Sequence, residues 1–229
     1  MRHAQVTAAI DAALDGKRLL DHPFYRRWEA GALTDGELAA YAEQYRHVEQ
    51  ALPDVLALIA GGLPEGPARD LVAANLADEV GVPEPHAVLF ESFADAVGAR
   101  PEAPASPATA ALVDLQRRTA SADPVAALAV IAAYEAQAAS VAVSKSAGLA
   151  EHYGIDGTGT RFWDVHAAME ADHADWSSEA LAQLCGDVDA VTAPAAAGAA
   201  AWWAFLDDRE AAAVAASPNG RDVPATACA

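Results

Sequence analysis

Residues 124–144 read PVAALAVIAAYEAQAASVAVS, and their composition is the clearest indication of the fold class. It contains one charged side chain, Glu135, over roughly the length of a membrane-spanning helix. It is rich in Ala and Val but poor in Leu, Ile and Phe, and Gln137 and Ser140 add polar groups. A helix that is apolar nearly all round is typical of the centre of a helical bundle. We therefore expect a buried helix here and no membrane span.

The sequence on either side of this stretch predicts further helices separated by Gly and Pro. Sustained period-two alternation and internal repeats are both missing from it. Thr34-Asp-Gly-Glu37 matches a capping box at the start of a long helix, and Arg161 begins another helix that runs to about Leu184. The prediction is an all-α fold with one domain over residues 1–215 and a disordered tail over residues 216–229.

The composition excludes several classes of partner. The chain has 14 Lys and Arg against 33 Asp and Glu, a formal net charge of -19. Such a chain repels phosphate, so we expect neither nucleic-acid binding nor docking on anionic lipid. Two cysteines are too few for a disulfide framework, and the first residues lack the apolar core of a signal peptide. These features predict a cytoplasmic protein.

Three potential metal ligands share one face of the helix predicted from Arg161. His166, Glu170 and His173 stand at positions i, i+4 and i+7, within about 60° of one another around the helix axis. The acidic residues of the same helix cluster on the opposite side, the natural water face: Asp164, Asp172, Asp175 and Glu179. The three ligands and Trp163 are therefore expected to point inward. Buried imidazoles and carboxylates must pair with one another or bind metal.

Three residues on other helices have the same chemistry. Glu135 is the isolated charge on the apolar helix. Instead of binding metal, its carboxylate could form a buried ion pair with Arg or Lys or be protonated. Glu79 ends a helix, where an anion is disfavoured, and His86 begins the next helix on an apolar face. Taken alone, His86 is most simply a core histidine and Glu79 a surface residue. These two residues become candidate metal ligands only in combination with the other four.

Together these residues form a candidate set of three carboxylates and three imidazoles. Such oxygen and nitrogen ligands without thiolate suit iron or manganese, and di-iron sites in helical bundles use similar sets. Zinc is disfavoured because six ligands exceed a tetrahedral site. The candidate ligands are Glu79, His86, Glu135, His166, Glu170 and His173.

The order of these residues resembles the haem-oxygenase-like di-iron oxidases, whose fold TenA and PqqC share. The resemblance rests on Glu79-x6-His86, Tyr134-Glu135 and His166-x3-Glu170-x2-His173, and it extends over most of the chain. It implies a bundle of about seven helices, two iron ions or an iron–manganese pair, O2 as co-substrate and no haem. It also implies a homodimer.

Within that family the chain is most similar to the CADD-type para-aminobenzoate synthases, which consume a tyrosine and a lysine of their own. Tyr25 and Lys145 stand at the matching positions, although a helix-terminal cation is an alternative role for Lys145. Tyr41, Tyr45 and Trp163 are expected to line the substrate pocket. The resemblance thus implies an O2-activating oxidoreductase that uses an external reductant. Its substrate would be a small amino-acid-like molecule or carboxylate, or its own Tyr25. For an external substrate, the reaction would be C–C cleavage, N-oxygenation or decarboxylation.

Three alternatives remain open. A cofactor-free oxidase of the PqqC type shares the fold but lacks the full ligand set. A thiaminase-type protein needs a nucleophilic cysteine, and neither Cys185 nor Cys228 is well placed. The non-enzyme alternative is an acidic helical interaction protein, which would purify without iron.

Overall fold

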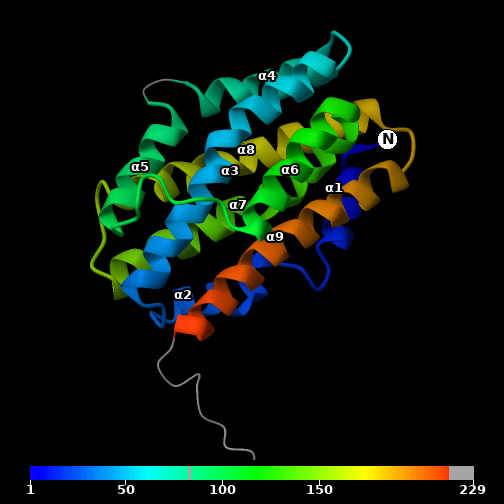
Figure 1. The fold of residues 1–229 in the computed structure, drawn as a ribbon. Coiled ribbons are helices and arrows are strands. Elements are labelled where there is room, and N and C mark those ends of the chain that lie inside the picture. The colour runs from blue at the N-terminus through cyan, green and yellow to red at the C-terminus, as the bar shows by residue number, and fades with distance from the viewer. Residues whose placement is uncertain (82–83, 217–229) are drawn as a thin grey trace, which may run out of the picture.

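The computed structural model describes residues 1–81 and 84–216, and over these residues it consists of nine α-helices, one 3-10 turn and no strand (Figure 1). The elements are α1 (His3–Ala13), η1 (Leu19–Asp21), α2 (Pro23–Glu29), α3 (Asp35–Gly62), α4 (Pro67–Glu79), α5 (His86–Ala96), α6 (Pro107–Ala122), α7 (Pro124–His152), α8 (Arg161–Leu184) and α9 (Asp189–Ala216). The all-α prediction is confirmed. The tail predicted for residues 216–229 lies, from residue 217 onward, outside the described residues.

The expected number of about seven helices is wrong for the described chain. The short helix α2 is a separate element, because Pro23 begins it and the turn at Gly31 (φ 64°) follows it. Gly81 and Pro85 lie between α4 and α5, and a proline interrupts a preceding helix. The predicted limits of α8 agree with the observed ones.

Helix α7 is the core of the bundle and packs mainly against α8 and α9. It is long and apolar enough to cross a membrane by length and composition, but 67% of its most apolar window is buried inside the protein. The prediction of a buried core helix is therefore confirmed for residues 124–144.

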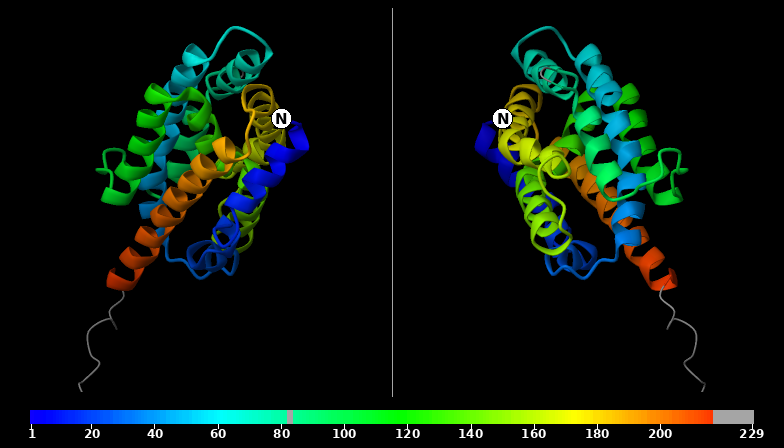
Figure 2. Two further views of the ribbon diagram at one scale, coloured as in Figure 1. Left: turned by 90° about the vertical axis from the view of Figure 1, so that its right-hand side faces the viewer. Right: turned by 90° about the vertical axis from the view of Figure 1, so that its left-hand side faces the viewer.

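Two hydrophobic clusters fill the interior. An Ala-rich aliphatic cluster joins α1, α4 and one end of α3, α7, α8 and α9. An aromatic cluster, which contains Tyr25, Tyr41 and Trp163, lies around α2 and α5. Figures 1 and 2 place α2 and α4 at opposite ends of the bundle, so the two clusters occupy opposite halves.

Helices α7 and α9 approach closely at Gly198. A Cβ atom at this position would lie 2.5 Å from the carbonyl oxygen of Val130, so that α9 or α7 would have to shift. Replacing Gly198 by Ala is therefore expected to destabilise the protein by about 1–3 kcal/mol, measured by urea unfolding. Gly61 in α3 is the matched control, because no atom lies within 4 Å of its Cβ position. Gly61→Ala should leave stability unchanged or raise it by up to about 1 kcal/mol. Equal effects of the two substitutions would contradict the close approach.

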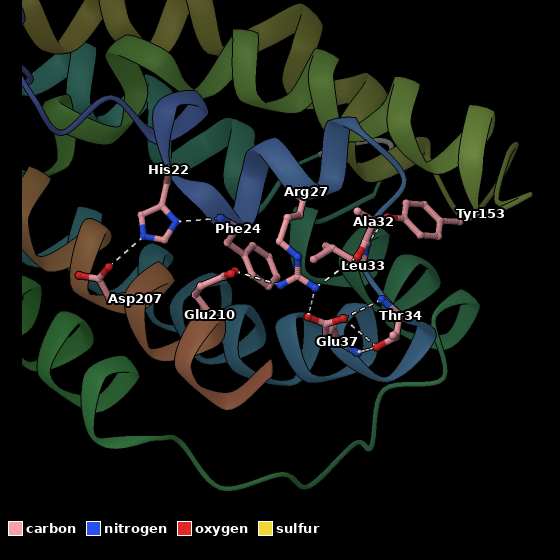
Figure 3. A network of polar contacts seen from close by, with 10 residues as sticks. All are labelled: His22, Phe24, Arg27, Ala32, Leu33, Thr34, Glu37, Tyr153, Asp207 and Glu210. Carbon is pink, nitrogen blue, oxygen red and sulfur yellow. Dashed lines mark hydrogen bonds and ion pairs between the residues drawn. The ribbon is translucent and has the colours of Figure 1, made fainter. Parts of the chain in front are cut away.

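A polar network fixes α2, the helix that carries Tyr25, against α3 and α9 (Figure 3). Arg27 pairs with Glu37 of α3 and with Glu210 of α9. His22 accepts a hydrogen bond from the Phe24 backbone at 3.1 Å on Nδ1, while its Nε2 lies 3.1 Å from Asp207. Glu37 also completes the predicted capping box with Thr34.

Candidate metal centre

All six predicted ligands are buried in the described structure, with at most 6% of any of them exposed. They come from four helices. Glu79 ends α4, His86 begins α5 and Glu135 lies in the middle of α7. His166, Glu170 and His173 share the inner face of α8, and the acidic residues assigned to its water face are exposed or half-buried. The inward orientation predicted from the helical angles is therefore confirmed.

Glu79, His86 and His166 form the most compact part of the set. His86 Nδ1 lies 3.0 Å from Glu79 Oε2, and the rings of His86 and His166 are 4.5 Å apart between centroids. Each of the three residues offers one ligand atom within 4.8 Å of the others. The break between α4 and α5 makes this possible, because it brings the end of one helix and the start of the next to the same point.

His173 and Glu170 extend this group along α8. His173 Nδ1 lies 3.7 Å from Glu170 Oε2 and 4.0 Å from Glu79 Oε1. His166 Nε2 lies 3.9 Å from Glu170 Oε1. Five of the six predicted ligands therefore form one continuous cluster of ionisable side chains.

Glu135 faces the same cavity but makes different contacts. Its Oε1 accepts a hydrogen bond from Asn75 at 2.7 Å, and its Oε2 accepts one from Ser177 at 2.5 Å. It lines the cavity together with Glu79, His166, Glu170 and His173. The alternative of a buried ion pair with Arg or Lys does not hold for the described residues, in which Glu135 forms no such contact.

Glu49 is a seventh buried ionisable residue of the site, which the sequence prediction missed. It lies in α3, is 4% exposed and lines the same cavity. Burial raises the pKa of its carboxyl well above the usual value, and the charges of Glu79 and Glu170 raise it further. A signal was present in the sequence, because Glu49 follows Tyr45 by four residues and therefore lies on the same helical face.

The electrostatics of the cluster favour a bound cation. Burial, with the charge of Glu170, raises the pKa of Glu135 to about 7. Burial alone would lower the pKa of His173, but its ion pair with Glu170 and the other nearby carboxylates raise it to about 9. Glu170 Oε2 is buried without a hydrogen-bond partner. Four buried carboxylates thus face three imidazoles, and a metal ion would satisfy both the excess negative charge and the unpaired oxygen. The donor set fits iron.

Metal binding at this site is expected to release protons. The pKa of about 9 for His173 means that its imidazole carries a proton near pH 8, which a metal ion must displace. Glu135, with a pKa of about 7, adds a second proton below that pH. Calorimetric titration with Fe(II) without oxygen, in two buffers of different ionisation enthalpy, should show at least one proton released near pH 8 and more near pH 6. An affinity that does not change over this range would contradict the assignment.

Lys145 and two tyrosines form a second polar group within the aromatic cluster. Lys145 is 1% exposed and donates a hydrogen bond from Nζ to Tyr41 Oη at 2.6 Å. Tyr41 Oη in turn shares a hydrogen bond of 2.8 Å with Tyr25 Oη. Burial lowers the pKa of the amine well below its usual value, and Glu170 and Glu49 offset part of this effect. The alternative role of Lys145 as a helix-terminal cation is wrong, because it lies inside α7 and is buried.

The predicted pocket residues differ in their positions. Tyr45 lines the cavity beside the candidate ligands, and its hydroxyl shares a hydrogen bond of 2.8 Å with Tyr134. Tyr41 and Trp163 do not line this cavity, because both point into the aromatic cluster around Lys145. The cavity itself has a volume of about 30 Å³, which is room for one or two water molecules.

The sequence is similar to that of known redox proteins. The sequence profile of the family of iron-containing redox enzymes matches residues 39–207. A 4-aminobenzoate synthase of Nitrosomonas europaea is 33% identical over 216 residues, which cover 86% of this chain and 88% of that protein. A 4-aminobenzoate synthase of Chlamydia muridarum is 30% identical over 184 residues, which cover 78% of each chain.

Solved structures confirm the expected fold. A TenA homologue from Pseudomonas syringae pv. tomato superposes with a TM-score of 0.73 at 17% identity, over 91% of this chain and 92% of that one. A domain of unknown function from Shewanella denitrificans, with a haem oxygenase-like fold, gives a TM-score of 0.71 at 20% identity, over 96% and 95% of the two chains. The architecture is therefore the haem oxygenase-like helical bundle.

Proposed function

This chain belongs to the family of iron-containing redox enzymes, and from that premise we propose that it forms 4-aminobenzoate at a di-iron centre, from its own Tyr25 and Lys145. The match to this family and the similarity to the two synthases identify the chain as a metal-dependent oxidoreductase. The product, the two iron ions, the use of O2 and the consumption of Tyr25 and Lys145 are the parts that we propose.

One observation carries the proposal. The hydroxyl of Tyr25 and the amine of Lys145 both contact Tyr41 Oη, at 2.8 and 2.6 Å, in a buried cluster beside the candidate ligands. 4-Aminobenzoate contains an aromatic ring, a carboxylate on that ring and an amino nitrogen opposite to it. In this proposal Tyr25 would provide the ring and, from its Cβ, the carboxylate carbon, and Lys145 would provide the nitrogen that replaces the phenolic oxygen. The Cα–Cβ bond of Tyr25 and the Cε–Nζ bond of Lys145 would therefore break, with O2 as the oxidant and an external reductant as co-reactant. The similarity to proteins named 4-aminobenzoate synthase supports this choice of product.

The residues of the site have different roles in this proposal. The two metal ions would be two irons or, alternatively, an iron–manganese pair. Six residues would hold them: Glu79, His86, Glu135, His166, Glu170 and His173. Iron at this position would supply the electrons for the reduction of O2, and an external reductant would restore them. Tyr41 orients the amine of Lys145 towards Tyr25. The lowered pKa of Lys145 favours the uncharged amine, which is the nucleophilic form.

The size of the cavity favours the protein's own tyrosine over an external substrate. About 30 Å³ beside the candidate ligands accommodates water or dioxygen but not an aromatic amino acid. Tyr25, which is 1% exposed, is already inside the protein. C–C cleavage, N-oxygenation or decarboxylation of an external substrate would require the bundle to open first.

Isotope labelling tests the proposed origin of the product. Protein produced with ring-labelled tyrosine is purified, loaded with Fe(II) without oxygen and exposed to O2 and a reductant in an unlabelled medium. We expect labelled 4-aminobenzoate, at no more than one molecule per chain, together with a decrease in the mass of the chain. Many turnovers, or an unlabelled product, would show that the ring comes from an external substrate.

A further inference from the structure

Asp78 contacts the candidate metal centre from outside the ligand set. It precedes Glu79 in the last turn of α4, and its carboxylate is 34% exposed. Its Oδ2 lies 3.3 Å from Nε2 of His173, a side chain that is itself only 2% exposed. The other ring nitrogen of His173, Nδ1, faces Glu170 and Glu79 at 3.7 and 4.0 Å. The two nitrogens of His173 therefore face different surroundings.

The two ring nitrogens of His166 also face different surroundings, but with Nδ1 and Nε2 exchanged relative to His173. Its Nδ1 lies 2.8 Å from the carbonyl oxygen of Phe162, one turn earlier in α8. A carbonyl oxygen only accepts, so Nδ1 of His166 carries the hydrogen and donates it. Its Nε2 is then the nitrogen with a free lone pair, and Nε2 is the atom that faces Glu170 at 3.9 Å. A hydrogen bond outside the cluster thus decides which nitrogen of His166 is available.

We propose that Asp78 is the positioning residue of His173, which it holds with the hydrogen on Nε2 so that Nδ1 is the metal-binding atom. The two histidines of α8 would then coordinate through different nitrogens, His173 through Nδ1 and His166 through Nε2. This inference rests on the proposed metal site. Histidine ligands commonly donate their second N–H to a carboxylate or carbonyl, which fixes the orientation of the ring.

The contact with His173 distinguishes Asp78 from an ordinary surface acid. A carboxylate in the last turn of a helix is disfavoured by the partial negative charge of the helix C-terminus. Asp78 occupies such a position and directs one oxygen towards His173. Asp95 stands at the corresponding position of α5, one residue before the helix ends, and is exposed. In the described structure no side-chain hydrogen bond or ion pair involves Asp95, so it is a matched control.

Metal binding by variants tests the proposal. Anaerobic titration with Co(II) is followed through the visible absorption of the bound ion for the wild type, Asp78→Leu, Asp78→Asn and Asp95→Leu. Asp78→Leu removes the acceptor and is expected to weaken binding about 10–100-fold. Asp78→Asn keeps a neutral acceptor and should lose less, whereas Asp95→Leu should bind as the wild type does. If Asp78→Leu does not fold, the loss measured for Asp78→Asn decides.

Nitrogen NMR of the wild type gives an independent result. In protein with 15N-labelled histidine and diamagnetic Zn(II) as the probe, we expect Nδ1 of His173 to coordinate and its Nε2 to carry hydrogen. Coordination through Nε2, or unchanged Co(II) affinity in both Asp78 variants, would overturn the role of Asp78. A wild-type protein that binds no metal would instead overturn the proposed metal site, so the two failures are distinguishable.

Discussion

Glu135→Gln is expected to abolish stoichiometric iron binding and to stabilise the metal-free protein above pH 7. The substitution removes a charged oxygen ligand from the middle of α7. It also removes a buried carboxylate that, without metal, forms no ion pair with Lys or Arg in the described structure. Glutamine can keep both hydrogen bonds, because its carbonyl accepts from Asn75 and its amide donates to the Ser177 hydroxyl.

The sign of the stability effect follows from the pKa of Glu135. Folding raises this pKa from 4.5 to about 7, so the native state favours the protonated carboxyl. The stabilisation by that proton is fully present below the unfolded pKa and is lost as the pH rises through 7. Near pH 8 the wild type carries a cost of roughly 3 kcal/mol that the glutamine variant lacks.

Urea unfolding of the metal-free proteins measures this effect. The variant should be the more stable of the two near pH 8, and the difference should shrink towards pH 5. Glu151→Gln is the matched control, because Glu151 is an exposed residue of the same helix. A Glu135→Gln protein that still binds two iron ions would contradict the assignment of Glu135 as a ligand.

Tyr25→Phe is expected to eliminate 4-aminobenzoate formation completely and to leave iron binding intact. In the described part of the chain, Tyr25 hydrogen-bonds Tyr41 and forms no hydrogen bond with a candidate ligand. The phenylalanine ring fills the same space, and the lost hydrogen bond costs about 1 kcal/mol of stability. Lys145→Met should also eliminate the product, since the proposed nitrogen source is removed.

The measurement is product formation per bound iron after one exposure to O2. Tyr153→Phe is the matched control, because its hydroxyl also makes one hydrogen bond, to the Leu33 backbone at 3.0 Å, at a site remote from Lys145. The control should form as much product as the wild type. Product from Tyr25→Phe would show that another residue or an external molecule provides the ring.

The sequence alone predicted correctly those features that depend on the pattern of residues within one helix. The helical angles of α8 place three ligands opposite an acidic water face, and this prediction is confirmed. The isolated charge of Glu135 on an apolar helix correctly indicated a buried carboxylate. Both features depend on a single helix, for which periodicity is a reliable guide. The all-α fold follows from the same kind of signal.

The parts that were missed depend on contacts between distant helices. Glu49 belongs to the site because α3 packs against α4 and places this carboxylate in the cavity beside Glu79, and its spacing from Tyr45 alone does not reveal that packing. Asn75 and Ser177 reach Glu135 from two other helices. Tyr41 and Trp163 were expected in the substrate pocket, but the packing of the aromatic residues directs them towards Lys145. Spacing along the chain cannot distinguish these neighbouring spaces.

The decisive measurement is anomalous scattering at the iron edge, from crystals loaded with Fe(II) without oxygen. We expect two iron peaks among the carboxylates of Glu79, Glu135 and Glu170 and the imidazoles of His86, His166 and His173. A map with no peak among these side chains, or with iron bound only at the surface, would show that this cluster is not a di-iron site.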